Sequence, residues 1–329
     1  MRDIDQTLRS LNPVRNGDPG SDAQMESILA APRTVAVRQP RARQKWTWAL
    51  AAATVTAGVF GYVVVDPFGV AAQPALAATP PPLRFQKTDR PAAEVLEEIA
   101  KSIADRPDDR PEPWTTEHYV TDDWALATRI DNIQVTSAVI PEHRETWEKA
   151  DGSAHWKSKT LPPVFQSAHQ REVWEAAGAV GSDSDESSGS APANGTSASE
   201  APATVKGMRD WLANGQRMGP GLTYEVVPER FQDHVFSPAQ RAALLRVLAS
   251  TQGIDYEGAV KDRAGRSGEA FSLTGRFGGL PNKRTLVFDR ATGNLLATEE
   301  QLQGDTGKLG VRPYSVIAYT TVLTAERLK

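Results

Sequence analysis

The chain has 329 residues, of which 40% are hydrophobic and 24% are charged, and its formal net charge is −4. These values suit one large globular core with appendages, and the net acidity argues against a protein that binds nucleic acid through a basic face. The absence of cysteine excludes disulfides, zinc–thiolate sites, iron–sulfur clusters and cysteine nucleophiles.

Residues 1–45 are polar and are interrupted by prolines. Two segments, "DIDQTLRSLNP" and "SDAQMESILAAP", have apolar residues at helical spacing, and Ser21 is a suitable N-cap for the second. Each would form a helix of about ten residues, which is marginal when isolated. We expect a cytoplasmic tail that is either disordered or folded against a cytoplasmic protein partner.

Residues 46–65 form an uncharged apolar run between Lys45 and Asp66. As a helix with a rise of about 1.5 Å per residue, the run spans roughly 30 Å, the thickness of the hydrocarbon core of a bilayer. Basic residues precede the run, and the next basic residue after it is Arg84. Because positive flanks stay inside, the sequence predicts a single-pass plasma-membrane protein with a cytoplasmic N-terminus and residues 67–329 outside.

Two other interpretations of the run are a buried helix of a soluble protein and a cleavable signal. A buried helix seldom carries such a one-sided basic flank. A cleavage site is offered by Ala75-Leu76-Ala77, but the run exceeds the usual signal core of about 7–15 residues and the site lies well beyond its end. The transmembrane helix is therefore favoured.

A tether rich in proline and alanine follows at residues 66–84. The segment "AAEVLEEIAKSIADRP" then predicts an amphipathic helix. Its apolar side carries Val95, Leu96, Ile99 and Ile103.

From Trp114 to about residue 160 the pattern changes to a period of two, rich in Thr, Val, Trp and Tyr. Three or four antiparallel strands are predicted here, with a hairpin turn at Asp151-Gly152. The tryptophans are expected to pack on or beside one sheet face rather than to form a ligand cage. They are Trp114, Trp124, Trp147 and Trp156.

Short helices and a low-complexity insert follow. The segment "SAHQREVWEAAGAV" predicts a short helix, whereas residues 181–204 lack large apolar side chains and are expected to be a disordered loop. A helix capped by Gly215 is predicted for "VKGMRDWLANG". The best helix is "SPAQRAALLRVLAST", with Ser237 as N-cap and Pro238 at the first helical position.

The remainder of the chain predicts five strands in a meander, with one turn at "DRATGN" marked by Asp289 and Gly293. Runs of strands and helices without regular alternation indicate the α+β class. We therefore expect residues 85–329 to form an extracytoplasmic domain with one curved antiparallel sheet packed by helices on one face.

Three segments in this order carry a family resemblance: "RETWEKADGSAHW", "SPAQRAALLRVLASTQGIDYEGAVKDRAGRSGEAFSL" and "LVFDRATGNLLATEEQL". With the cysteine-free tail, basic flank, span and tether, they resemble an actinobacterial family of single-pass membrane proteins often encoded beside extracytoplasmic-function sigma factors. The resemblance covers nearly the whole chain and supplies no catalytic residues. The outer region is also similar in strand pattern to the lipoprotein-carrier and periplasmic sigma-regulator fold, a half-open sheet around helices.

Residues 1–45 contain neither Cys nor His, so the tail does not match the zinc-binding anti-sigma module. Direct contact with a sigma factor through such a module is not expected.

The sequence offers no anchor for catalysis. The histidines form no metal-binding motif, and "GRFGGLPNK" lacks the phosphate-loop pattern and is expected to be a hairpin loop. Neighbouring acids such as Glu299 and Glu300 should point to opposite faces of a strand and cannot share a proton. We predict no catalytic, cofactor-binding or metal-binding residues. The histidines are His118, His143, His155, His169 and His234.

Two functions fit these features best. The first is a non-enzymatic, membrane-anchored binding or regulatory protein, linked to sigma-factor or envelope signalling, with a lipid or peptide ligand outside. The alternative is an extracytoplasmic lipid or lipoprotein carrier, or an envelope-maintenance protein, in which the span is only an anchor. A hydrolase with a dispersed site is the third and least favoured.

Overall fold

The computed structural model describes residues 78–131, 134–163, 165, 167–176, 186–192, 200–277, 279–307 and 309–329. All of them belong to one compact unit of the chain. The predicted tail 1–45 and span 46–65 lie outside these residues. Among the described helices, none is long and apolar enough to cross a membrane.

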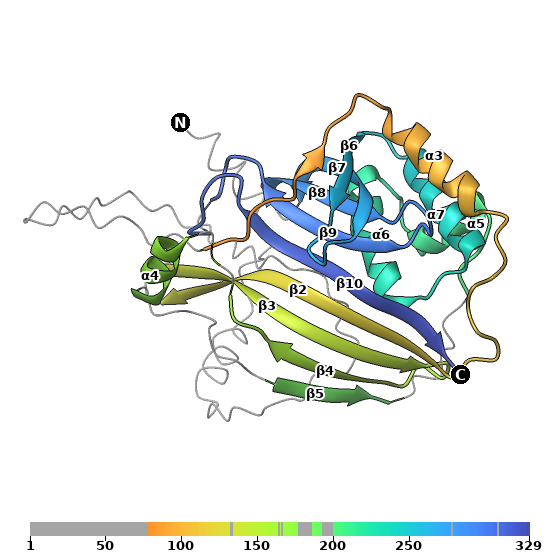
Figure 1. Ribbon diagram of the computed structural model, residues 1–329, viewed down its shortest axis with the longest axis horizontal. Coiled ribbons are helices and arrows are strands. Elements are labelled where there is room, and N and C mark those ends of the chain that lie inside the picture. Colours follow the sequence, from red (N-terminus) through yellow and green to blue (C-terminus); the bar gives the residue numbers. More distant parts are fainter. Residues whose placement is uncertain are drawn as a thin grey trace, which may run out of the picture. The chain divides into compact units, whose positions relative to one another are not determined.

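One antiparallel sheet of ten strands forms the frame, in the order β1-β6-β7-β8-β9-β10-β2-β3-β4-β5 (Figure 1). The two predicted blocks of strands join where β10 pairs with β2, which confirms the α+β class and the five-strand meander. The strands are β1 (Phe85–Gln86), β2 (Thr116–Asp131), β3 (Gln134–Lys149), β4 (Ala154–Thr160), β5 (Glu186–Ala191), β6 (Ile254–Lys261), β7 (Ser267–Phe277), β8 (Leu280–Phe288), β9 (Leu295–Leu302) and β10 (Val316–Leu328).

The helices are unevenly distributed along the sheet. The main helix–strand contacts join α3 to β6 and α6 to β7 and β9, while α3 and α5 pack on α7. Figure 1 shows these helices gathered near β6–β9, with β2–β5 extending away from them. The helices are α3 (Ala92–Ile103), α4 (Ala168–Ala176), α5 (Val205–Ala213), α6 (Pro220–Asp233) and α7 (Pro238–Ala249).

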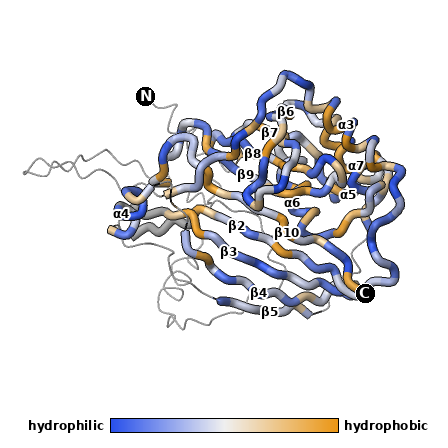
Figure 2. Tube along the Cα trace, viewed as in Figure 1, coloured by the Kyte–Doolittle hydropathy of each residue, from blue (hydrophilic) through white to orange (hydrophobic). Residues whose placement is uncertain are grey.

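The main core lies between these helices and the meander. Phe271 on β7 and Phe288 on β8 are fully buried and meet Leu244 and Leu245 of α7 in one cluster. Figure 2 shows the corresponding hydrophobic colouring on α3, α7 and the neighbouring strands. Because burying each such side chain stabilises the fold by about 1.5–3 kcal/mol, this cluster is the main source of stability.

Helix α7 begins as predicted. The Ser237 hydroxyl accepts a hydrogen bond from the Gln240 amide, and the Gln240 side chain accepts one from the Ser237 amide. This reciprocal capping satisfies two amides that would otherwise lack partners at the helix start. The helix is buried nearly all round, including Gln240 and Arg241, which a single apolar face did not predict.

Helix α6 was not predicted from the sequence. Pro228 lies inside it, and an internal proline removes a backbone donor and disfavours a helix. The helix nevertheless forms because Tyr224, Val227 and Phe231, spaced three and four residues apart, are all buried in the main core. Tertiary packing thus overrides the local cost of the proline.

The opposite face of the meander is covered by residues 78–86, which we call the strap. Ala78 and Thr79 are buried, and Leu83 and Phe85 pack on a second cluster that includes Val260 and Val287. The predicted tether at 66–84 therefore needs correction at its C-terminal end, where Ala78 and Thr79 are buried and Leu83 packs on the sheet. Apolar side chains within the proline-rich run supply the reason.

Hydrogen bonds fix the strap as well. Thr79 donates to the Ser315 hydroxyl over 3.2 Å, and the Leu83 amide donates to Glu299. Arg263 donates to the Pro81 carbonyl and pairs with Glu299. The strap is thus bonded to β9 and to two loops of the meander, β6–β7 and β9–β10.

Strand β5 corrects another prediction. It lies inside the segment 181–204, which was expected to be disordered throughout, and all six of its residues pair with β4. The segment lacks large apolar side chains, but an extended chain can still pair its backbone with a strand edge that is already in place. Residue 204, at the end of the same segment, is the N-cap of α5.

Candidate functional site

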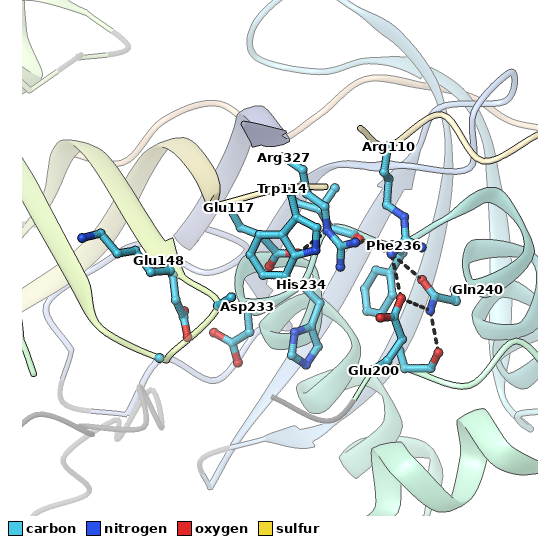
Figure 3. Close-up of a pocket in the computed structure, with 15 residues that line it drawn as sticks. Arg110, Trp114, Glu117, Glu148, Glu200, Asp233, His234, Phe236, Gln240 and Arg327 are labelled. Atoms are coloured by element: carbon cyan, nitrogen blue, oxygen red, sulfur yellow. Dashed lines mark hydrogen bonds and ion pairs between the residues drawn. The ribbon is translucent and has the colours of Figure 1, made fainter. Parts of the chain in front are cut away.

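A polar pocket of about 120 Å³ lies where the turn between β3 and β4 approaches the start of α7 (Figure 3). Five separate stretches of chain supply its wall. The lining residues are Arg110, Trp114, Glu117, Glu148, Lys149, Ala150, Gly152, Glu200, Ala201, Asp233, His234, Val235, Phe236, Gln240 and Arg327.

One side of the pocket is a hydrogen-bonded network around Arg110. Its guanidinium pairs with Asp108 and Glu200 and donates to the Val235 carbonyl and to Gln240. Burial disfavours the charged form of Glu200, but hydrogen bonds from Gln240 and Arg110 outweigh that effect and lower its pKa. The network therefore joins three segments that are distant in the chain, near residues 110, 200 and 240. In it the positive charge of Arg110 is balanced by the carboxylates of Asp108 and Glu200.

A second network is centred on Arg327, near the end of β10. Its Nε atom lies 2.9 Å from a Glu117 oxygen, and its Nη1 atom lies 2.8 Å from Glu112. The other Glu117 oxygen accepts a hydrogen bond of 2.7 Å from Tyr119. The guanidinium also stacks on Trp114, with its Cζ atom 4.5 Å from the ring centre.

His234 follows α6 and forms the floor between the two networks (Figure 3). Its ring lies 4.9 Å from the ring of Trp211. Burial, assisted by the positive charge of Arg230, lowers the pKa of His234 to about 4. The imidazole is therefore neutral at pH 7 and adds no positive charge to the pocket.

This pKa shift predicts a specific loss of stability in acid. Between pH 6.5 and pH 4, His234 binds a proton in the unfolded chain but not in the folded one, so stability falls as pH falls. The lowering of the pKa from 6.5 to about 4 corresponds to a loss of about 3 kcal/mol in the free energy of unfolding when the pH falls through this range. Urea unfolding at several pH values should show that His234→Asn removes this part of the slope. Parallel slopes for both proteins would contradict the assignment.

The neighbouring acids singled out in the sequence point to opposite faces, as predicted. Glu299 contacts Arg263 and the strap, whereas Glu300 accepts a hydrogen bond from Asn282. Asp122 contacts His143, whereas Asp123 accepts from the Thr320 hydroxyl. Neither pair can act as a proton-sharing dyad.

His118 and His155 flank Trp147 on one face of β2–β4, and both stack on its ring. His118 lies between Glu145 and Glu326, with ring nitrogens 3.0 and 3.2 Å from their oxygens. His169 lies on α4. Within the described part of the chain, no three His, Asp or Glu side chains are grouped so that they could hold a metal ion.

The tryptophans do not share one sheet face, which corrects the prediction. Trp147 pairs with His155 across β3 and β4, so the next residue, Trp156, points to the opposite face. Trp124 stacks on Tyr319 at a centroid distance of 5.2 Å. Each ring has its own neighbours, and the four do not form a cage.

The glycine-containing segment "GRFGGLPNK" connects two paired strands. Phe277 at the end of β7 pairs with Leu280 at the start of β8. This confirms the predicted hairpin loop.

Sequence reasoning singled out Trp114, Gly152 and His234 among the pocket residues, and it assigned none of them a role in binding. Arg327 and Glu117 are 210 positions apart, and Arg110 and Gln240 are 130 apart. Such pairs have no local spacing that could reveal them. The nearest signal was that strand ends beside hairpin turns are places where polar side chains gather.

No family model matches the sequence, and no curated protein matches it. A crystal structure of MucB is 14% identical over 71% of this chain and 58% of that chain, with a TM-score of 0.26. A crystal structure of MucB in complex with MucA(peri) is 13% identical over 71% and 55%, with a TM-score of 0.23. The chain thus spans a little over half the length of these structures. At such TM-scores neither likeness carries an argument, and the actinobacterial family stays a prediction.

Proposed function

We propose that this chain is a noncatalytic regulatory protein of the cell envelope. In this proposal residues 46–65 anchor it, the described domain lies outside and binds a polypeptide partner, and the tail 1–45 links it to sigma-factor or envelope signalling. The observation that carries the proposal is the polar pocket. Its wall brings paired charges from five stretches of chain to one open surface beside the β3–β4 turn.

The pocket chemistry supports binding rather than catalysis. Among the described residues that line it, none is a Ser, Thr or Tyr that could act as a nucleophile. Each oxygen of Glu117 already accepts a hydrogen bond, from Arg327 and from Tyr119, so this carboxylate helps to hold the network together.

The size and charge of the pocket favour a polypeptide ligand over a lipid ligand. A volume of about 120 Å³ is smaller than the roughly 300–1,000 Å³ of pockets that enclose drug-sized ligands, and seven of its fifteen lining residues are charged. The space between the helices and the meander is filled by side chains such as Phe271, Phe288 and Leu245. An acyl chain would have to displace them, so the carrier alternative is disfavoured.

The strap supports a link between the outer domain and the predicted span. Residues 78–86 follow the span after a short connection, and they are fixed to the sheet through Thr79, Leu83 and Arg263. The meander is therefore bonded directly to the strap, from which the chain leads back to the predicted span, as the regulatory proposal requires.

Transcript profiling in the host tests the regulatory proposal. We expect deletion of residues 1–40 and the rim substitution Lys149→Glu to shift the same coherent set of transcripts. Lys149 is exposed at the pocket, so its substitution should leave the fold intact. Lys261→Glu, an exposed change on β6, is the matched control and should shift none.

The outcome that would contradict the proposal is equally specific. If deletion of the whole gene alters the envelope while neither the tail deletion nor Lys149→Glu changes transcripts, the tail is not a signalling element. The protein would then act outside the membrane only.

A further inference from the structure

Strand β5 is an edge strand of the sheet, and few contacts hold it within the part of the chain that the structure describes. Its sequence, ESSGSA, contains no apolar side chain larger than alanine, and Ser and Gly are poor strand formers. Four of its six residues are exposed. The backbone ladder to β4 is therefore its main attachment.

Two polar contacts add to the ladder. The hydroxyls of Ser158 and Ser187 lie 2.8 Å apart, and Lys159 pairs with Glu186 over 2.7 Å. The lysine and glutamate side chains are 56% and 74% exposed, and exposed pairs contribute little stability. The edge of β4 is thus filled by a strand that could be exchanged at low cost.

The side chains of β4 determine which residues a neighbouring strand can place beside it. Lys157 and Lys159 lie on one of its faces, and in β5 they stand opposite Ser188 and Glu186. On the β5 side, only Lys159 therefore faces an acidic residue, whereas the acidic neighbour of Lys157 is Glu145 on β3. A strand with acids at both positions would complement β4 better than β5 does.

Trp156 sets a size limit at the centre of this edge. It stands opposite Gly189, and a Cβ atom at residue 189 would lie 2.3 Å from the Cζ2 atom of Trp156. A residue larger than glycine cannot occupy this position unless the indole moves. The edge therefore selects for glycine at one register position.

We propose that the edge of β4 is a strand-acceptor site, which β5 fills in the free protein and which an extended acidic segment of another protein takes when bound. The segment adds to the sheet by backbone pairing, as in other cases of β-strand addition. It carries acidic residues opposite Lys157 and Lys159 and glycine opposite Trp156. This site lies at the sheet edge, so its test does not depend on the polar pocket.

Peptide binding to the full chain in detergent tests the proposal. The variant Gly189→Val should detach β5 and open the edge. A tethered internal strand competes at an effective concentration near millimolar, so if β5 as a free peptide binds with a Kd of about 10 μM, the labelled peptide ESEGSA should bind this variant about 100-fold more tightly than the unaltered chain. Fluorescence anisotropy measures both affinities.

Matched changes test each part of the argument. Ser197→Val lies in the same insert outside β5 and should bind the peptide as weakly as the unaltered chain. The peptide ESEVSA should not bind the open variant, and Lys159→Glu should weaken binding of ESEGSA. Ser188→Pro opens the edge without a bulky side chain and serves if Gly189→Val does not fold.

Three binding results would overturn the proposal: equal affinity for the open and unaltered chains, absence of binding to both open variants, or binding of ESEVSA as tight as that of ESEGSA. A fourth result, a concentration-dependent dimer that the peptide does not dissociate, would overturn it in favour of strand exchange between two copies. None of these results affects the transcript test of the proposed function.

Discussion

Replacing Arg327 with methionine should lower the free energy of unfolding by about 3–5 kcal/mol, because it leaves a buried carboxylate without its partner. The side chains of Arg327 and Glu117 are only 7% and 8% exposed. The substitution keeps much of the apolar contact with Trp114 but removes the charge. Urea unfolding of the full chain, followed by tryptophan fluorescence, measures the change.

A double substitution separates the charge effect from the loss of packing. Adding Glu117→Gln to Arg327→Met should recover part of the lost stability, because the stranded carboxylate is removed. Lys206→Ala is the matched control, since its pair with Asp210 is exposed and should leave the urea midpoint unchanged. Equal losses for Arg327→Met and the control would show that the pocket network contributes nothing to stability.

The second large effect is expected at the centre of the main core. Phe288→Ala should lower the free energy of unfolding by about 3–5 kcal/mol, through lost burial and the cavity left behind. Phe288 is fully buried and lies 5.9 Å from the ring of Phe231 on α6 and 6.2 Å from Phe271 on β7. The loss should also loosen α6, which depends on this packing.

Hydrogen exchange distinguishes this loosening from a general loss of stability. We expect the amides of α6 to lose more protection than those of β2 in the Phe288→Ala protein. Leu328→Ala, at a side chain that is 36% exposed, is the control for truncation outside the core. If α6 keeps its protection, the sheet does not hold this helix in place.

Elements with strong local signals were predictable from the sequence. Helix α7 has Ser237 and Pro238 at its start and buried leucines along its length, and both the cap and the burial were confirmed. The turn between β8 and β9 follows from Asp289, which accepts a hydrogen bond from the Thr292 amide. In these places propensity, capping and hydrophobic pattern agree.

Elements held by distant partners were not predictable. Helix α6 contains Pro228 and forms because its apolar residues meet the meander. Strand β5 pairs with β4 although its own composition disfavours a strand. The strap packs on the sheet through Leu83 and Phe85 inside a proline-rich run. Each depends on a surface that exists only after the rest of the chain has folded.

The pocket depends on contacts over even longer separations. Arg327, Glu117 and Trp114 meet because β10 pairs with β2, and that pairing joins two strand blocks far apart in the chain. Polar residues of this kind have no periodic pattern to mark them. Predicting the sheet correctly was therefore not sufficient to predict the pocket.

In the proposed function, the central claim is that the described domain binds a polypeptide at the polar pocket. The most direct measurement places a photo-crosslinking amino acid at position 149 in the full chain in its host cells, with position 261 as the control. We expect a discrete covalent adduct with one polypeptide at position 149 and no such adduct at position 261. Further substitutions on the pocket rim should lower the yield of the adduct at position 149. Absence of an adduct at position 149, or the same adducts at both positions, would contradict the account.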